Sequence, residues 1–164
     1  MDMIEETKHK EKIAIVGAGP VGALLAVMLA KKGYQIDLFE SRQDSRKSSL
    51  YQGRSINVAL SDRGWRALKA VGLDDEIRQH AIPMTSRVMH DLQGNLTRQP
   101  YGKEGQAIWS VSRSGINEQL IELAEKESSV NIHFSKRLID LNFTQGSALF
   151  SNEDNSQQQH HSDL

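Results

Sequence analysis

A glycine-rich turn directly after a short apolar run constrains the fold of this 164-residue chain more than any other feature. Residues 12–16 (KIAIV) form a β-branched run typical of a buried strand, and residues 17–22 read GAGPVG. Helix-forming residues continue to Lys32, where Gly33 is placed to end the helix. Residues 35–40 (QIDLFE) then alternate as a strand does. This order predicts a βαβ unit with a right-handed crossover, the opening of a Rossmann-like α/β fold with a parallel sheet.

The glycines and a later acid have the spacing of a dinucleotide-binding turn. Gly17 permits a tight turn, Gly19 leaves room for a pyrophosphate, and Gly22 lets the helix pack closely on the strand. The N-terminus of the helix adds free N–H groups and the positive end of the helix dipole. Glu40 lies 18 residues after Gly22, where a carboxylate accepts hydrogen bonds from a ribose and repels a 2′-phosphate. The residues therefore predict FAD or NAD in this cleft and disfavour NADP, without separating FAD from NAD.

Composition and charge exclude several classes of function. The sequence has no cysteine, which excludes disulfides, thiolate metal sites and a cysteine nucleophile. Its six histidines lack the spacing of a zinc site, so we expect no metal. Residues 13–150 hold 17 basic and 14 acidic side chains, a net charge of +3 that suits an anionic small ligand and is too weak to predict nucleic acid. The longest apolar run, residues 23–30, is too short for a membrane helix, so we expect no membrane partner and a cytoplasmic chain.

The rest of the chain alternates helical and strand patterns. Helices are expected over residues 61–71, 73–80 and 112–127. Ser61 is placed to cap the first of these and Gly72 to end it. Strands are expected at 87–92, 96–101, 107–111, 131–134, 138–143 and 148–150, the first two and the last two as hairpins.

These patterns predict three parts. Residues 1–11 read as a charged N-terminal arm, residues 12–150 as a dinucleotide-binding domain, and residues 151–164 as a polar tail. Because both ends are rich in polar residues, we expect them to be solvated arms. A basic loop formed by Arg42, Arg46, Lys47 and Arg54 has two readings, a flap over an anionic cofactor or a solvated loop.

Several further motifs go beyond a generic nucleotide-binding fold. They are GRSINVALSDRGWRALKAVG at residues 53–72, FESR at 39–42, IPM at 82–84, PYG at 100–102 and SVSR at 110–113. Together with the glycine turn they resemble the kynurenine 3-monooxygenase family of FAD- and NADPH-dependent aromatic hydroxylases. The resemblance implies an FAD-binding fold and hydroxylation of L-kynurenine to 3-hydroxykynurenine, with NADPH as co-substrate. It also implies the N-terminal, truncated part of such an enzyme, inactive by itself, because the later motifs of the family are missing from the sequence.

The resemblance assigns site residues by position. The pyrophosphate turn is Gly17, Gly19, Val21 and Gly22, the adenosine-ribose contact is Phe39, Glu40, Ser41 and Arg42, and further FAD contacts are Ala59, Arg113 and Leu138. Arg87 and Tyr101 match positions that hold the carboxylate of L-kynurenine, since a guanidinium binds a carboxylate bidentately and a phenol adds a donor. No side chain is singled out as a catalytic acid or base.

Two functions from different classes stay open at this point. The first is an FAD-dependent monooxygenase, represented here by its cofactor-binding part. The alternative is a non-catalytic module that binds NAD or ADP. A complete NAD-dependent dehydrogenase is a weaker third choice, because no catalytic dyad follows the nucleotide-binding part.

Overall fold

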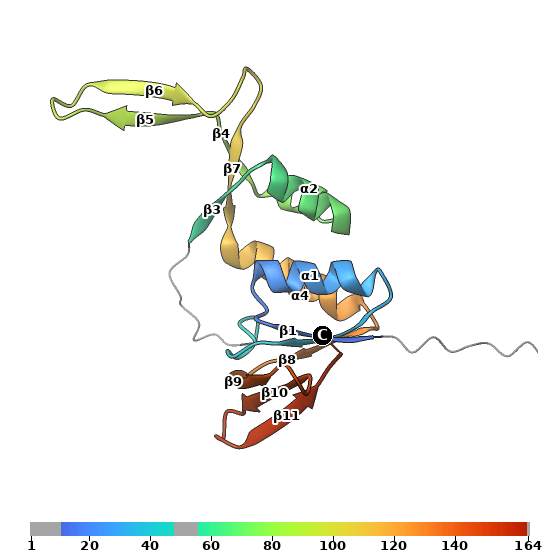
Figure 1. The fold of residues 1–164 in the computed structure, drawn as a ribbon. Helices are drawn as coiled ribbons and strands as arrows, with labels where there is room; N and C mark the ends of the chain where they lie inside the picture. Colours follow the sequence, from blue (N-terminus) through green and yellow to red (C-terminus); the bar gives the residue numbers. More distant parts are fainter. Residues whose placement is uncertain (1–10, 48–55, 164) are drawn as a thin grey trace, which may run out of the picture. The chain divides into compact units, whose positions relative to one another are not determined.

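The computed structural model describes residues 11–47 and 56–163 (Figure 1). These residues fall into two compact units: 11–47 with 121–163 form the first unit, and 56–120 form the second. Most of the predicted N-terminal arm, residues 53–55 of the long motif, and Arg54 of the basic loop lie outside the described residues.

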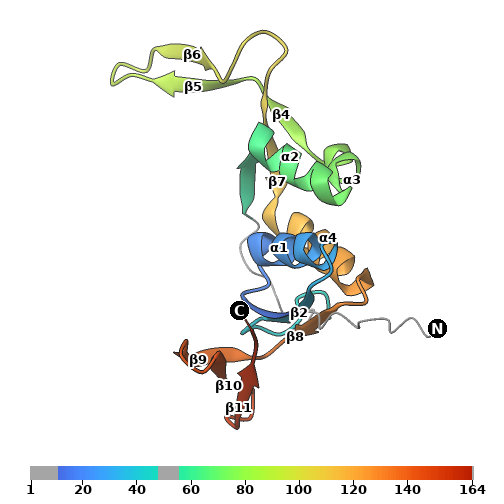
Figure 2. The same ribbon diagram turned by 45° about the vertical axis from the view of Figure 1, so that its right-hand side comes forward.

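A parallel sheet forms the centre of the first unit. Its strands are β1 (Lys12–Val16), β2 (Gln35–Phe39) and β8 (Val130–His133), in the order β1-β2-β8. Both pairings are parallel, which confirms the predicted βαβ unit, and β8 corresponds to the strand expected at residues 131–134. Helix α1 (Pro20–Ala30) connects β1 to β2 and covers one face of the sheet (Figures 1 and 2). Its buried residues are small, which allows the close packing of helix on strand: Ala23, Ala26, Val27 and Ala30.

An antiparallel sheet covers the opposite face of the parallel sheet (Figure 2). It consists of β9 (Arg137–Asn142), β10 (Ser147–Ser151) and β11 (Gln157–His161), in the order β11-β10-β9. Phe39 from β2 and Phe150 from β10 stack between the two sheets with ring centroids 4.1 Å apart. Phe150 is 1% exposed, so this aromatic pair fixes one sheet against the other.

The polar stretch 151–164 differs from the solvated arm that its composition suggested. Residues Gln157–His161 pair with β10 along their whole length. Beyond them, the Asp163 N–H donates to the Lys12 carbonyl at 2.9 Å, and the Lys12 N–H donates to Asp163 Oδ2 at 2.8 Å. These bonds satisfy backbone groups and need no apolar side chain, so polar residues can complete a sheet edge while their side chains stay largely exposed.

The second unit contains short strands and two helices. Its elements are β3 (Asn57–Leu60), α2 (Asp62–Val71), α3 (Asp74–Gln79), β4 (Ile82–Met84), β5 (Ser86–His90), β6 (Leu96–Pro100) and β7 (Ile108–Ser112). Strands β3, β7 and β4 form an antiparallel sheet in that order, and β5 pairs with β6 as the predicted hairpin. The sequence reading did not identify β3 or β4, which are four and three residues long.

Helix α2 ends as expected but begins differently. Its buried side chains are Trp65, Leu68 and Val71, and Gly72 follows in the left-handed conformation with φ 84°. Ser61 occupies the N-cap position without a side-chain cap hydrogen bond, so the expected role of its hydroxyl is wrong. Its contribution is the carbonyl that accepts the Trp65 N–H at 3.0 Å.

Helix α4 (Arg113–Lys126) begins in the second unit and ends in the first. Ile116, Leu120 and Ala124 are buried on one side of this helix. Leu123 is half-buried, and Ile121 is buried in addition.

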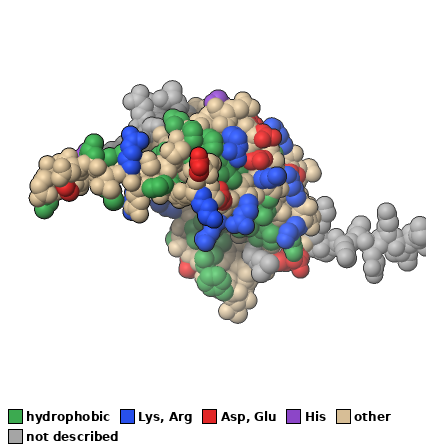
Figure 3. Space-filling model, turned by 90° about the horizontal axis from the view of Figure 1, so that it is seen from above, with side chains coloured by type: hydrophobic (Ala, Val, Ile, Leu, Met, Phe, Trp, Pro, Cys, Tyr) green, Lys and Arg blue, Asp and Glu red, His purple; other side chains and the backbone are tan. Residues whose placement is uncertain are grey.

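The β5–β6 hairpin leaves apolar side chains in solvent. Val88 is 46% exposed, Leu96 64% and Leu92 fully exposed. The space-filling view shows hydrophobic side chains along the surface of this hairpin (Figure 3). Among the helices of residues 11–47 and 56–163, none has the length and apolar character that a membrane crossing needs.

Candidate functional site

The glycine turn between β1 and α1 requires glycine at two positions. Gly17 has φ 102°, a conformation that other residues rarely adopt, and its N–H donates to the Phe39 carbonyl at 2.7 Å. A Cβ on Gly22 would lie 1.9 Å from the Gly17 carbonyl oxygen, so a side chain there cannot fit without moving the helix. The two glycines therefore join the turn to the end of β2 and hold α1 close against it.

Gly19 has a different reason to be small. Its φ of −71° suits any residue, and a Cβ there would have nothing within 4 Å, so neither strain nor crowding explains it. Open space lies in front of this backbone at the start of α1, and Val21 beside it is 80% exposed. Because the first N–H groups of a helix lack intrahelical acceptors, this place fits a phosphate group.

Glu40 directly follows β2, and its carboxylate is held at the glycine turn. Its Oε2 accepts the Ala18 N–H at 3.0 Å. Its Oε1 accepts the Arg42 N–H at 3.0 Å and the Ser41 hydroxyl at 3.2 Å. Each carboxylate oxygen has room for more than one donor, so the group can also accept ribose hydroxyls. Glu40, Ser41 and Arg42, which the resemblance assigned to one contact, thus lie together with the turn.

The segment after β8 supports Glu40 from the other side. The Glu40 N–H donates to the His133 carbonyl at 2.9 Å, and the Glu40 carbonyl accepts the Lys136 N–H at 2.8 Å. The Ser135 N–H donates to the Arg42 carbonyl at 3.0 Å, and Ser135 has φ 56°. The backbone of Glu40 and Arg42 is therefore tied to residues more than ninety positions later in the chain.

The side chains of Phe39 and Leu138 belong to the core. Phe39 is 4% exposed and stacks on His133 at 4.7 Å between centroids, in addition to Phe150. Leu138 packs against the same cluster. The contacts with FAD that the resemblance assigned to these two positions stay predictions.

Two histidines and an aspartate lie beside Phe39. His133 Nε2 is 2.6 Å from Asp37 Oδ1, and His160 Nε2 is 3.5 Å from Asp37 Oδ2. Burial lowers the pKa of His160, and the Asp37 carboxylate opposes that shift. The described residues hold no group of three or more histidine, aspartate or glutamate side chains arranged to bind a metal ion.

Arg46 of the basic loop is paired with acids. Its guanidinium contacts Asp44 and makes two hydrogen bonds to Glu125 of α4, each 2.7 Å long. The hydrogen bonds from Arg46 lower the pKa of Asp44 and of Glu125. Lys47 is 82% exposed and lies 3.7 Å from Asp44. Arg46 is therefore not part of a solvated loop, and the reading of this loop as a flap over an anionic cofactor stays a prediction.

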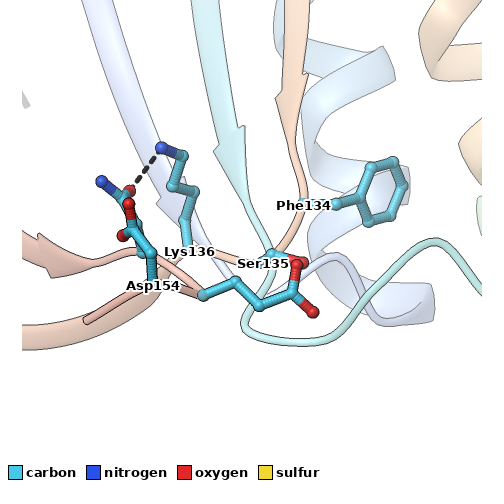
Figure 4. Close-up of a pocket in the computed structure, with 6 residues that line it drawn as sticks. Phe134, Ser135, Lys136 and Asp154 are labelled. Carbon is cyan, nitrogen blue, oxygen red and sulfur yellow. Dashed lines mark hydrogen bonds between the residues drawn. The ribbon is translucent and has the colours of Figure 1, made fainter. Parts of the chain in front are cut away.

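An open hollow of about 410 Å³ lies beside the loop, lined by residues 134–136 and 152–154 (Figure 4). The Lys136 amine donates to the side-chain oxygens of Asn152 and Gln158, and Gln43 donates to Glu153. In Figure 4 the ring of Phe134 points away from Lys136. Lys136 and Glu153 are thus engaged with neighbouring side-chain amides, and Asp154 accepts hydrogen bonds from Ser156.

The second unit carries the other predicted residues. Ala59 lies in β3 opposite Ser110 of β7, and the Arg113 N–H donates to the Ile56 carbonyl at 3.1 Å. These backbone contacts bring Ala59 and Arg113 onto neighbouring segments. Their contacts with FAD stay predictions.

Arg87 and Tyr101 share one face of the β5–β6 hairpin. Arg87 lies opposite Gln99 and donates to its side-chain oxygen through Nε at 2.8 Å. Tyr101 is two residues beyond Gln99, and its N–H donates to the Thr85 carbonyl at 3.0 Å, which continues the strand pairing. Since alternate residues of a strand face the same way, this pairing puts both side chains on one face. Their contact with the carboxylate of L-kynurenine stays a prediction.

Sequence reasoning missed the side-chain contacts between distant segments of the first unit. Arg46 and Glu125 are 79 positions apart, and Asp37 and His133 are 96 apart. The signal for Arg46 was an aspartate two residues before it, a spacing that suits a local ion pair. Nothing in the sequence named Glu125 as the second partner.

Comparison with known proteins gives a family match and several relatives. The family model described as "FAD binding domain" matches residues 10–162. A kynurenine 3-monooxygenase of Anopheles gambiae is 47% identical over 135 residues, 82% of this chain and 28% of the relative. One of Sus scrofa is 45% identical over 131 residues, covering 80% and 28%, and one of Drosophila melanogaster is 40% identical over 161 residues, covering 98% and 35%. The expected resemblance is confirmed, and the chain spans about three tenths of the length of these relatives.

Solved structures share the fold. The p-nitrophenol 4-monooxygenase PnpA of Pseudomonas putida DLL-E4 has a TM-score of 0.73 at 20% identity, covering 92% of this chain and 38% of its own. The flavin-dependent monooxygenase PieE, solved with FAD and substrate, has a TM-score of 0.75 at 17% identity, covering 95% and 29%. At these identities the likeness confirms the predicted α/β fold.

Proposed function

The chain belongs to the FAD binding domain family, and on that premise we propose that its glycine turn and Glu40 bind the adenosine diphosphate portion of FAD. The observation that carries the proposal is the Glu40 carboxylate, held 3.0 Å from the Ala18 N–H at the turn. Phosphates at the start of α1 and a ribose at Glu40 would use both features together. The binding part is residues 12–150 in this proposal.

We further propose that the chain serves an FAD-dependent kynurenine 3-monooxygenase that uses NADPH to convert L-kynurenine to 3-hydroxykynurenine. The names of the relatives support this reaction. Bound FAD would supply the redox chemistry of oxygen insertion, while this chain's own residues hold and orient the cofactor. Arg87 and Tyr101, on one face of the hairpin, are the proposed contacts for the substrate carboxylate.

The binding proposal is tested by calorimetric titration of the purified chain with ADP and with FAD. Glu40→Ala should weaken ADP binding by roughly 1.5–3 kcal/mol, the range for a lost charged hydrogen bond. Glu122→Ala is the matched control, because Glu122 is an exposed acid on α4 and should leave affinity unchanged. Equal affinity of both variants would mean that the cleft has been misplaced. NAD binding without FAD binding would favour the non-catalytic module.

The reaction is tested on protein expressed to the full length of the gene. We expect bound flavin and NADPH oxidation that depends on added L-kynurenine, with 3-hydroxykynurenine detected by mass spectrometry. A flavin-loaded protein that is indifferent to L-kynurenine would refute the substrate while leaving the FAD proposal intact.

A further inference from the structure

The segment from Glu40 to Lys47 is held at separate places. At its start, backbone hydrogen bonds tie Glu40 and Arg42 to residues 133–136. In its middle, Gln43 donates to Glu153. Near its end, Arg46 binds the side chain of Glu125 in α4. The last of these is an ionic contact between two well-separated parts of the first unit.

Arg46 uses its guanidinium in a way that lysine cannot copy. Nη1 and Nη2 donate to the two oxygens of Glu125 at 2.7 Å, a bidentate pair. Nε and Nη2 donate to the two oxygens of Asp44 at 2.9 and 2.8 Å, and the Arg46 N–H donates to Asp44 Oδ1 at 3.1 Å. Asp44 is 6% exposed and Arg46 18%, so the contact between these two side chains is shielded from water, whereas Glu125 is 44% exposed. Two bidentate contacts fix both the position and the plane of the guanidinium.

This anchor lies four and five residues after two of the groups that donate hydrogen bonds to Glu40. Ser41 Oγ and the Arg42 N–H both donate to Glu40 Oε1, and they belong to the segment that Arg46 fastens. Backbone hydrogen bonds to residues 133–136 would still hold Glu40 and Arg42 if the Arg46 end loosened. The segment would then be fixed at fewer places, and we expect its two donors to hold the carboxylate in one orientation less firmly. A ligand would then have to order the carboxylate on binding, which lowers affinity.

We propose that Arg46, through its bidentate contact with Glu125, is a positioning residue that presets the Glu40 carboxylate for the ribose of the bound nucleotide. The inference rests on the proposed function, because it assumes that Glu40 meets a ribose. It assigns no contact between Arg46 and the ligand.

The test compares ADP with 2′-deoxy-ADP by calorimetry, because the ratio of their affinities reports the ribose contact. In the unaltered chain we expect ADP to bind about 10- to 100-fold more tightly, as for a charged hydrogen bond. Arg46→Lys keeps the positive charge and loses the bidentate hydrogen bonds of the guanidinium. Glu125→Gln removes the charge of the more exposed partner. Both variants should therefore fold. In each we expect the ratio to fall by about fivefold or more. Lys47→Ala, which removes a neighbouring positive charge, should leave the ratio unchanged.

Amide hydrogen exchange tests the same proposal without ligand. In Arg46→Lys and Glu125→Gln we expect faster exchange at the Ala18 and Arg42 N–H groups, which donate to Glu40, with unchanged protection in α1. Thermal unfolding of each variant shows whether the fold persists.

The outcomes separate this inference from the proposed function. Failure of the unaltered chain to bind ADP would refute the proposed function. The inference is overturned if protection at Ala18 and Arg42 is unchanged in both variants, whether or not ADP binds. It is also overturned if both nucleotides weaken equally, since that result indicates a general structural role.

Discussion

Gly22 offers a direct test of how closely α1 packs against the turn. In Gly22→Ala, the new Cβ would lie 1.9 Å from the Gly17 carbonyl oxygen and 3.1 Å from its carbon. Ordinary contact begins at 3.4 Å, so the gap must open by about 1.5 Å. The obstacle is backbone and cannot rotate away. Moreover, the Gly17 N–H is bonded to Phe39, so moving the turn also disturbs the end of β2.

Two effects of opposite sign determine how much Gly22→Ala changes the free energy of unfolding. Alanine is favoured over glycine inside a helix by about 1 kcal/mol, and less in the first turn. Overpacking against an immobile group costs about 1–3 kcal/mol and occasionally more. We therefore expect a net loss of about 2 kcal/mol, which corresponds to a thermal midpoint lower by roughly 4–8 °C for a chain of this size.

The assay is thermal and urea unfolding followed by circular dichroism, with Gly19→Ala as the control. Gly19 lies three residues away in the same turn, has an ordinary φ of −71°, and has open space at its Cβ. The free energy of unfolding of Gly19→Ala should therefore differ from that of the unaltered chain by less than about 0.5 kcal/mol. If Gly22→Ala were as stable as Gly19→Ala, the close packing of α1 on the turn would be refuted.

Three further outcomes are expected. Gly19→Ala should weaken ADP and FAD binding by about tenfold or more, although its stability is unchanged. The reason is that the new methyl group would occupy the space proposed for the pyrophosphate, and calorimetry measures both affinities. Because burial lowers the pKa of His160, the folded chain binds a proton there less readily than the unfolded chain, so the unfolding free energy should fall as the pH drops below about 6.5. Urea titrations at pH 7.5 and pH 5.5 should show a smaller fall in His160→Gln and the full fall in His161→Gln, whose side chain is exposed. In the full-length gene product, Arg87→Lys and Tyr101→Phe should each raise the KM for L-kynurenine by about tenfold, and an unchanged KM would remove these residues from the substrate site.

Local chemistry explains what the sequence predicted well. Gly17, Gly22 and Glu40 could be identified because each follows from a local feature of the sequence. Gly17 allows a positive φ, Gly22 allows close packing, and Glu40 is an acid directly after a strand. The same holds for the left-handed Gly72 after α2. Such requirements depend on neighbours within a few residues or on the repeat of a helix or strand.

Contacts between distant segments explain what the sequence did not predict. Arg46 reads as a loop cation, and its partner Glu125 reads as one of several exposed acids on an amphipathic helix. The strand Gln157–His161 has no apolar residue, so its composition indicates solvent, whereas its backbone completes a sheet. The pattern of apolar side chains predicts which residues are buried. It does not predict which polar groups form hydrogen bonds or ion pairs with one another.

The position of Glu40 is therefore a tertiary property, although its identity is a local one. The βαβ opening supplies the carboxylate and the Ala18 donor, but residues 133–136 fix the backbone of Glu40 and Arg42. The anchor at Arg46 adds a second fixed end, on α4. A βαβ fragment that stopped before residue 113 would keep the glycine motif and lose these supports. Its glycines would still leave room for phosphate, yet its carboxylate would have to be ordered by the ligand, at a cost in affinity. The later segments of the first unit thus bear on the proposed nucleotide site as directly as the motif that predicts it.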